Sequence, residues 1–105
     1  MTIVEIKSAK DFSELINSKI HKKVIIFYTA KDCICSIELR PIFENCSKQY
    51  KNIQFATLYI DKLKDFEDHV ELGTPNFHLY INGRKLEQVI GADEEGLIDL
   101  CKKYS

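Results

Sequence analysis

Two cysteines stand one residue apart in the stretch DCICS, residues 32–36, directly after the apolar run VIIFYTA. The run predicts a buried strand, and the apolar spacing after it predicts a helix that begins near Cys33. The N-terminus of a helix carries unpaired N–H groups and partial positive charge, which favour a thiolate. Thiolates attack disulfides, so two cysteines at this strand-to-helix junction predict thiol chemistry.

The second cysteine, Cys35, is poorly placed to form a disulfide with Cys33. On a regular helix, residues two apart are rotated by about 200° and point away from each other. A Cys33–Cys35 bridge therefore requires the first turn to unwind, and the strained disulfide would be easily reduced. We keep Cys35 as an alternative, inefficient resolving thiol, that is, a thiol that would break a mixed disulfide between Cys33 and a substrate.

The other two cysteines are predicted to be core residues. Cys46 follows Cys35 by about 16 Å of helix rise, whereas a disulfide joins Cα atoms at most about 7 Å apart. Cys101 lies at helical spacing from Leu97 on the apolar stripe of the last predicted helix. Both side chains are interpreted as small buried hydrophobes.

Metal binding is only weakly indicated. A C-x-C pair supplies two ligands, no second cysteine pair completes a tetrahedral site, and the three histidines have no ligand spacing to it. An intersubunit cluster held by Cys33 and Cys35 stays open as an alternative, but we expect no metal and no cofactor. His78 alternates with the apolar Phe77 and Leu79 on a predicted strand, so we expect a packed, hydrogen-bonded histidine.

The composition is that of an ordinary globular protein. The chain has 105 residues, of which 45% are apolar and 30% charged, and we expect one domain over residues 1–105. Lys and Arg (15) nearly balance Asp and Glu (16). Because no basic cluster is interleaved with aromatic residues, we expect no nucleic-acid partner.

Several features of the sequence favour a cytoplasmic protein. The N-terminus MTIVEIKSAK lacks the basic and apolar regions of a signal peptide, and no apolar run approaches the roughly 20 residues of a membrane span. Four cysteines without a secretory signal favour free thiols over a disulfide framework. We expect a monomer without membrane contact, which Cys33 could link into a disulfide dimer on oxidation.

Periodicity and turn residues predict elements in the order β-α-β-α-β-α-β-β-α. The predicted strands span residues 2–6, 23–30, 52–60, 76–81 and 85–90, and the predicted helices span 8–20, 33–50, 61–72 and 93–105. The apolar stripe of the first helix runs from Phe12 to Ile20, and Asn82-Gly83 is a hairpin signal. Alternation in the first half favours parallel strands, and the hairpin adds an antiparallel edge. The sequence therefore predicts an α/β protein with a mixed five-stranded sheet and helices on both faces.

This order resembles the thioredoxin family, most closely its eukaryotic cytosolic type, over essentially the whole chain. FYTAKDC is similar to the segment that joins the family's second strand to its active site, and Pro41 matches the proline inside the family's second helix. GTPNF resembles the loop of the family's cis-proline, here Pro75, and INGRKLEQVIGAD resembles its last hairpin and glycine loop. The resemblance implies a thioredoxin fold, with four helices flanking the mixed sheet.

The active-site stretch departs from the family pattern, with CICS in place of CGPC. By the resemblance, Cys33 falls on the nucleophilic cysteine and Ser36 on the resolving cysteine. Asp32 replaces the aromatic residue that usually precedes the nucleophile, and Phe27 replaces the buried acid beneath the site. We expect Asp32 to disfavour a thiolate on Cys33 and Lys31 to favour it.

In thiol–disulfide exchange, a thiolate first forms a mixed disulfide with the substrate, and a second thiol then resolves it. These changes keep the residue for the first step and remove those for the second. A serine hydroxyl cannot resolve a mixed disulfide, and Phe27 removes the carboxylate that would deprotonate a resolving thiol. We therefore expect a monothiol enzyme in which Cys33 attacks protein or small-molecule disulfides and an external thiol such as glutathione resolves the intermediate. The resemblance also implies a substrate groove lined by Ile34, Thr74, Pro75, Gly91 and Ala92.

The same groove supports an alternative function. A thioredoxin-fold module without redox activity could use the groove at Pro75 to bind an extended segment of a partner by strand addition. The reactivity of Cys33 separates the two hypotheses, because the enzyme needs a thiolate there and the binding module does not.

Overall fold

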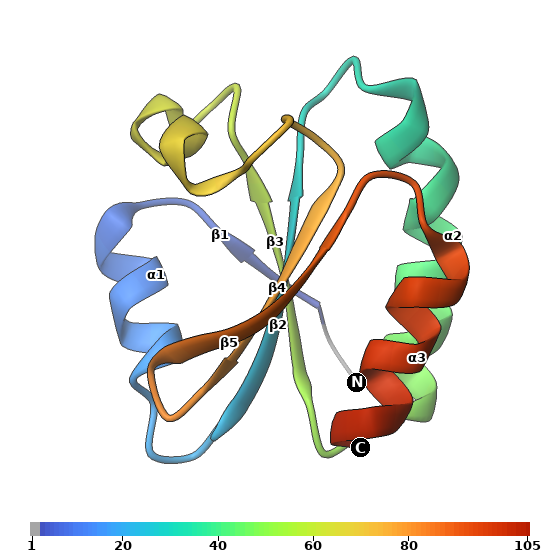
Figure 1. Ribbon diagram of the computed structural model, residues 1–105. Helices are drawn as coiled ribbons and strands as arrows, with labels where there is room; N and C mark the ends of the chain where they lie inside the picture. Colours follow the sequence, from blue (N-terminus) through green and yellow to red (C-terminus); the bar gives the residue numbers. More distant parts are fainter. Residues whose placement is uncertain (1–2) are drawn as a thin grey trace.

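The central strand of the sheet is β2 (Lys23–Thr29), which pairs in parallel with β3 and antiparallel with β4 (Figure 1). The computed structural model describes residues 3–105, and these contain five strands in the order β1-β3-β2-β4-β5. The other strands are β1 (Val4–Ile6), β3 (Gln54–Tyr59), β4 (Asn76–Ile81) and β5 (Arg84–Ile90). The predicted mixed sheet is confirmed, while the start of the first predicted strand, at residue 2, lies outside the described residues.

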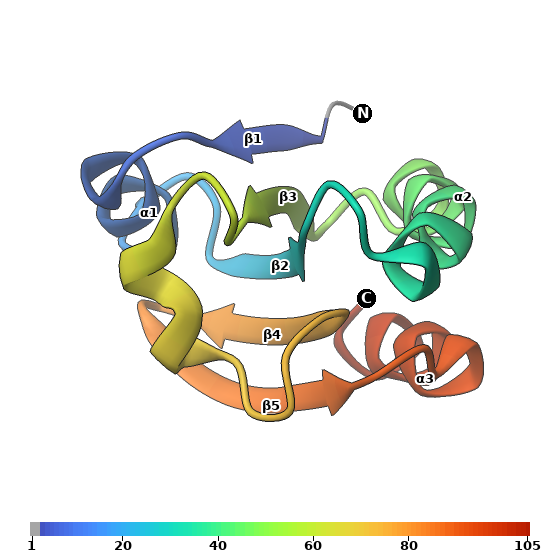
Figure 2. The same ribbon diagram turned by 90° about the horizontal axis from the view of Figure 1, so that it is seen from above.

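Helices cover both faces of the sheet (Figure 2). One face carries α1 (Ala9–Ile16) and the 3₁₀ helix η1 (Lys64–His69), and the other carries α2 (Ile34–Gln49) and α3 (Glu94–Tyr104). Alternate side chains of β2 point to opposite faces. Ile25 and Phe27 join the core beneath α2 and α3, whereas Ile26 and Tyr28 join the core beneath α1 and η1. The predicted order of elements is confirmed.

The helix α1 is shorter than predicted because polar side chains end it. Its start is as expected, since the Ser8 hydroxyl accepts a hydrogen bond from the backbone N–H of Asp11 at 3.0 Å. At the other end Asn17 is the C-cap, and Ser18 Oγ accepts from the backbone N–H of Ile20 at 3.1 Å, so a turn replaces the helix. Ile20 is 84% exposed, and the prediction that it continues the apolar stripe is wrong.

The segment predicted as a helix over residues 61–72 forms only the short 3₁₀ helix η1. Phe66 is the one side chain within η1 that is buried. A longer α-helix depends on packing along a whole apolar face, and one buried side chain does not supply it.

The terminal hairpin and the last helix form as predicted. Asn82 and Gly83 both have positive φ, at 52° and 84°, as a two-residue hairpin turn requires. A Cβ atom on Gly83 would lie 2.4 Å from Asn17 Oδ1, so a larger residue would have to displace the Asn17 side chain and adopt a strained positive φ. Asp93 caps α3 by accepting a hydrogen bond from the backbone N–H of Gly96 at 2.8 Å.

His78, on β4, is packed as predicted but is not hydrogen-bonded. Its side chain is 1% exposed, and neither ring nitrogen has a hydrogen-bond partner among the described residues. The ring lies 4.5 Å from that of Tyr28 and 6.3 Å from that of Tyr80, between centroids. Burial, with smaller contributions from Lys85 and His69, lowers the pKa of His78 to about 4. The neutral imidazole therefore packs as an aromatic ring.

The buried His78 predicts that the protein loses stability in acid. In the unfolded chain the imidazole takes a proton below about pH 6.5, whereas in the folded protein it does so only near pH 4. Stability from His78 is therefore fully present above pH 6.5 and falls by about 3 kcal/mol by pH 4. Urea unfolding at pH 7 and pH 4 measures it, with His78→Phe as the control. If His78→Phe lost as much free energy of unfolding between pH 7 and pH 4 as the wild type, the acid sensitivity would not come from His78.

Candidate functional site

Cys33 is the N-cap of α2, at the end of the short loop that follows β2. Its φ and ψ are −84° and 103°, so the residue is extended, and its carbonyl accepts the first helical hydrogen bond from the N–H of Ile37 at 3.0 Å. The loop is held from two sides. Cys33 N–H donates to the Ala30 carbonyl at 3.2 Å, and Lys31 N–H donates to Asp61 Oδ2 at 3.3 Å.

The antiparallel pairing of β2 with β4 brings the loop before β4 next to this thiol. Tyr28 is paired with Asn76, so the chain just before Asn76 lies beside the end of β2. The Thr74–Pro75 peptide bond in this loop is cis, and Cys33 Sγ donates to the Thr74 carbonyl at 3.6 Å. The thiol therefore faces the backbone of the proline loop.

A third loop joins the site through backbone contact. Gly91 N–H donates to the Pro75 carbonyl at 2.9 Å, so Cys33, Thr74, Pro75 and Gly91 form one continuous set of contacts. Ala92 follows Gly91 and is exposed. Ile34 follows Cys33 and is 71% exposed. These are the six residues that the sequence predicted for the nucleophile and its groove.

Cys35 and Ser36 lie in very different surroundings. Cys35 is exposed, whereas Ser36 is completely buried. All four cysteines of the chain are free thiols. The Cys33 thiol is directed to Thr74, so Cys35 stands on the solvent side of the turn and Ser36 on the inner side.

The surroundings of Cys33 favour its thiolate. Partial burial opposes ionisation, but the side chains of Ser36 and Thr74 and the backbone N–H groups of Cys35 and Ser36 together lower the pKa of Cys33. The Ser36 hydroxyl has no hydrogen bond of ordinary geometry among the described residues, so it is free to turn toward the sulfur. Apart from Thr74 of the proline loop, the groups that lower the pKa are hydrogen-bond donors in the first turn of α2.

Lys31 and Asp32 are not among the groups that dominate the pKa of Cys33, which are those of the helix turn and Thr74. Both charged side chains are exposed, where solvent screens their charges.

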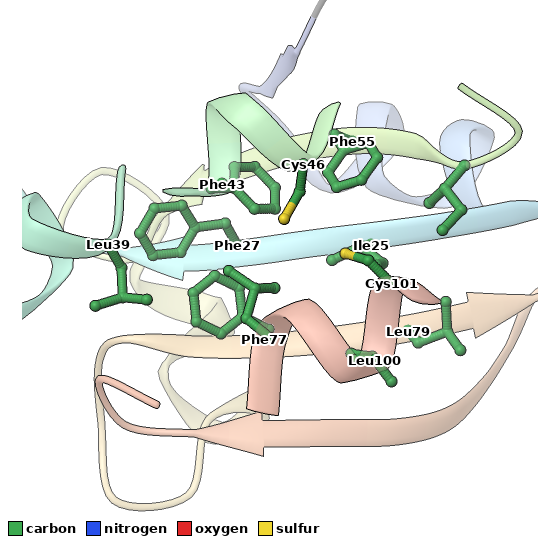
Figure 3. Close-up of a cluster of buried hydrophobic side chains, with 12 residues drawn as sticks. Ile25, Phe27, Leu39, Phe43, Cys46, Phe55, Phe77, Leu79, Leu100 and Cys101 are labelled. Carbon is green, nitrogen blue, oxygen red and sulfur yellow. The ribbon is translucent and has the colours of Figure 1, made fainter. Parts of the chain in front are cut away.

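Phe27 fills the space beneath the site. Its side chain is 1% exposed and stacks on Phe77, with 4.7 Å between ring centroids. It also packs at 5.0 Å against Phe43 of α2, and Figure 3 shows the ring of Phe27 close to both of these rings. An ionisable group at this position would have to lose its hydration within an aromatic cluster.

Two apolar side chains near the site, and one polar anchor, were not predicted from the sequence. Ile37 is 45% exposed and lies one turn from Ile34, while Leu72, two residues before Thr74, is 91% exposed. We call Ile34, Ile37 and Leu72 the apolar rim. Asn76 Nδ2 donates to the Glu71 carbonyl at 3.0 Å and so anchors the proline loop. The i, i+3 spacing of Ile34 and Ile37 was the available signal.

Within the described residues, no group of three or more His, Cys, Asp or Glu side chains is placed to hold a metal ion. In the same part of the chain, no helix has both the length and the apolar character needed to cross a membrane.

The comparisons with known proteins agree with this architecture. A family model described as Thioredoxin matches residues 3–103. The thioredoxin of Ictalurus punctatus is 33% identical over 98 residues, which cover 90% of this chain and 92% of that protein. The thioredoxin of Coprinus comatus is 32% identical over 101 residues, with 93% of each chain covered. A solved thioredoxin structure from Plasmodium falciparum has a TM-score of 0.90 at 26% identity and covers 98% of this chain and 100% of that chain.

The sheet order, the flanking helices and the thiol beside a cis-proline define a thioredoxin-fold protein. The family match extends over nearly the whole chain, and the chain belongs to the thioredoxin family. Membership supports a function of the thiol–disulfide oxidoreductase type. Thioredoxins act on protein disulfides, which agrees with the expected class of partner.

The aromatic cluster beneath the site predicts that an acid at position 27 is poorly tolerated. Phe27→Asp removes a buried ring and leaves a carboxyl without a partner, so we expect a loss of about 4 kcal/mol or more in the free energy of unfolding. The control Phe27→Leu keeps an apolar side chain and should cost about 1–2 kcal/mol. Denaturant unfolding measures both. A Phe27→Asp variant as stable as Phe27→Leu would contradict this account of the cluster.

Proposed function

We propose that the protein is a monothiol thiol–disulfide exchange enzyme in which Cys33 is the nucleophile. The observation that carries the proposal is the position of the Cys33 thiol at the N-terminus of α2, 3.6 Å from the Thr74 carbonyl of the proline loop, where hydrogen-bond donors of the helix turn lower its pKa. The inner position of the same turn holds the hydroxyl of Ser36, which forms no disulfide. Of the two positions of a dithiol site, only that of Cys33 therefore carries a thiol able to react.

The first step is attack of the Cys33 thiolate on a substrate disulfide. A new S–S bond forms to Cys33, the substrate S–S bond breaks, and the departing thiolate takes a proton from solvent. The N–H groups of Cys35 and Ser36 stabilise the negative charge on Cys33 before the attack. The product is a mixed disulfide between Cys33 and the substrate.

An external thiol completes the cycle. With a glutathionylated substrate, Cys33 takes up the glutathione sulfur and releases the substrate thiol. A second glutathione thiolate then attacks the glutathione sulfur of that bond, so that oxidised glutathione leaves and the Cys33 thiolate is restored. Cys35 contributes little to resolution, because it is exposed on the solvent side of the turn while the Cys33 thiol faces Thr74.

The groove beside Cys33 holds the substrate. The Thr74 carbonyl faces the thiol, and the backbone of the proline loop is positioned to pair with an extended segment that carries the disulfide. Ile34, Gly91 and Ala92 border this segment, and the apolar rim extends the contact surface. Protein disulfides with apolar flanking residues, and glutathione mixed disulfides of such proteins, are the substrates we propose.

The second candidate function is a binding module that uses the same groove without redox chemistry. The apolar rim favours it, because Leu72 at 91% exposure and Ile34 at 71% offer contact surface whether or not Cys33 reacts. In this function the mixed disulfide has no role, and replacement of Cys33 leaves binding of the partner intact.

Turnover of a glutathionylated peptide tests the enzymatic proposal. The peptide carries a mixed disulfide with glutathione, and its release is followed in the presence of glutathione, glutathione reductase and NADPH. We expect wild-type protein to accelerate the release, Cys33→Ser to return it to the rate without protein, and Cys35→Ser to stay within about twofold of wild type.

The control variant separates the possible mechanisms. Cys33→Ser and Cys35→Ser each replace one thiol of the same turn, so a general effect on the helix would affect both. A rate lost in Cys35→Ser would contradict the monothiol mechanism. A wild-type rate no higher than that of Cys33→Ser would contradict the enzyme and favour the binding module.

A further inference from the structure

Two cysteines that the proposed reaction does not use lie together in the core. Cys46 of α2 is 3% exposed and Cys101 of α3 is completely buried. They belong to the same cluster of buried side chains, between the two helices and the sheet. Figure 3 shows both sulfur atoms pointing into the space between α2 and α3. The sequence predicted each as a core residue but gave no indication that the two sulfurs meet.

The two thiols interact directly. The neighbouring side chain of Cys101 lowers the pKa of Cys46 against the opposing effect of burial. The same interaction, together with burial, raises the pKa of Cys101. The first proton that the pair loses is therefore favoured to leave Cys46, whose thiolate then has the S–H of Cys101 beside it.

We propose that Cys46 and Cys101 form a second, buried redox couple, which a small neutral peroxide oxidises to an intramolecular disulfide between α2 and α3. The proposal rests on the facing sulfurs, their shared burial and their direct interaction. It concerns a site distinct from Cys33, since Cys33 lies at the surface end of α2 and Cys46 lies in the core.

Hydrogen peroxide can oxidise the two thiols to a disulfide in two steps. The Cys46 thiolate attacks one peroxide oxygen, the O–O bond breaks, and the departing hydroxide takes a proton to leave as water, which yields a sulfenic acid on Cys46. The Cys101 sulfur then attacks the Cys46 sulfur. The S–S bond forms, the S–O bond breaks, and a second water leaves with the Cys101 proton. The two sulfurs lose two electrons, and the peroxide gains them.

The burial of Cys46 and Cys101 restricts which oxidants can reach their sulfur atoms. Both sulfurs lie within packed side chains, so a large charged disulfide such as oxidised glutathione does not reach them. A local displacement of α3, the last helix of the chain, opens the space between α2 and α3. Hydrogen peroxide is small and uncharged and needs only such an opening.

A disulfide here would join parts of the chain that are far apart in sequence. Position 46 is in the last turn of α2 and position 101 is near the end of α3, so the closed loop includes β3, η1, β4 and β5. Cross-links that close long loops restrict the unfolded chain strongly. Oxidation should therefore stabilise the fold and hold the helix that carries Cys33 against α3.

The test uses the Cys33→Ser, Cys35→Ser double variant, so that its outcome does not depend on the proposed function. The protein is treated with hydrogen peroxide near neutral pH and analysed by mass spectrometry and thermal unfolding. We expect the monomer to lose the mass of two hydrogen atoms, and protease digestion to yield the Cys46 peptide linked to the Cys101 peptide. The melting temperature should rise by at least about 10 °C and return to its starting value with a reducing agent.

The control is the same double variant with the further change Cys46→Ala, which leaves Cys101 without a partner. This control should show neither the loss of mass nor the gain in melting temperature. Three results in the double variant would overturn the proposal: two unmodified thiols after treatment, a gain of oxygen without a disulfide, or a disulfide formed only between molecules. Each is read from the mass of the double variant itself, whether or not the control folds.

Discussion

The antiparallel pairing of β2 with β4 is the constraint on which the site depends. Because Tyr28 is opposite Asn76, the end of β2 and the beginning of β4 lie at the same edge of the sheet. One strand leads into Cys33 at the start of α2, and the other is preceded by Thr74 and Pro75. The distance of 3.6 Å between Cys33 Sγ and the Thr74 carbonyl follows from this register. A shift by one residue would exchange the two faces of the strand and separate the thiol from the loop.

The same strand joins the site to the core. Ile25 and Phe27 of β2 contribute to the cluster beneath α2 and α3, and Phe27 stacks on Phe77 at 4.7 Å. A resolving thiol requires a nearby base, whereas a monothiol site does not. In this chain an aromatic ring takes the place beneath the site, and a buried hydroxyl takes the inner position of the helix turn. Both features agree with the proposed monothiol mechanism, in which a thiol from outside the chain completes the second step of exchange.

Local signals predicted most of the fold, and tertiary contacts decided the rest. The apolar run of β2 and the Asn82-Gly83 turn are encoded within a few residues, and each formed as expected. The exposure of Ile20 follows from the turn that Asn17 and Ser18 form after α1, a local feature that the apolar spacing did not reveal. His78 has no hydrogen-bond partner among the described residues and packs against Tyr28, a contact between residues distant in sequence.

For the site, the chain order and the resemblance placed Cys33 beside the proline loop, but they did not reveal that the helix turn and Thr74 are the main influences on its pKa. The meeting of Cys46 with Cys101 depends on how α2 packs on α3, which no local pattern specifies.

The most direct measurement of the central claim is the rate of alkylation of Cys33 by iodoacetamide from pH 5 to pH 10, in a Cys35→Ser background. Glutathione under the same conditions serves as the free-thiol reference. The account predicts that the Cys33 rate rises at lower pH than the reference and exceeds it at pH 7, and a rate profile that coincides with glutathione would contradict it.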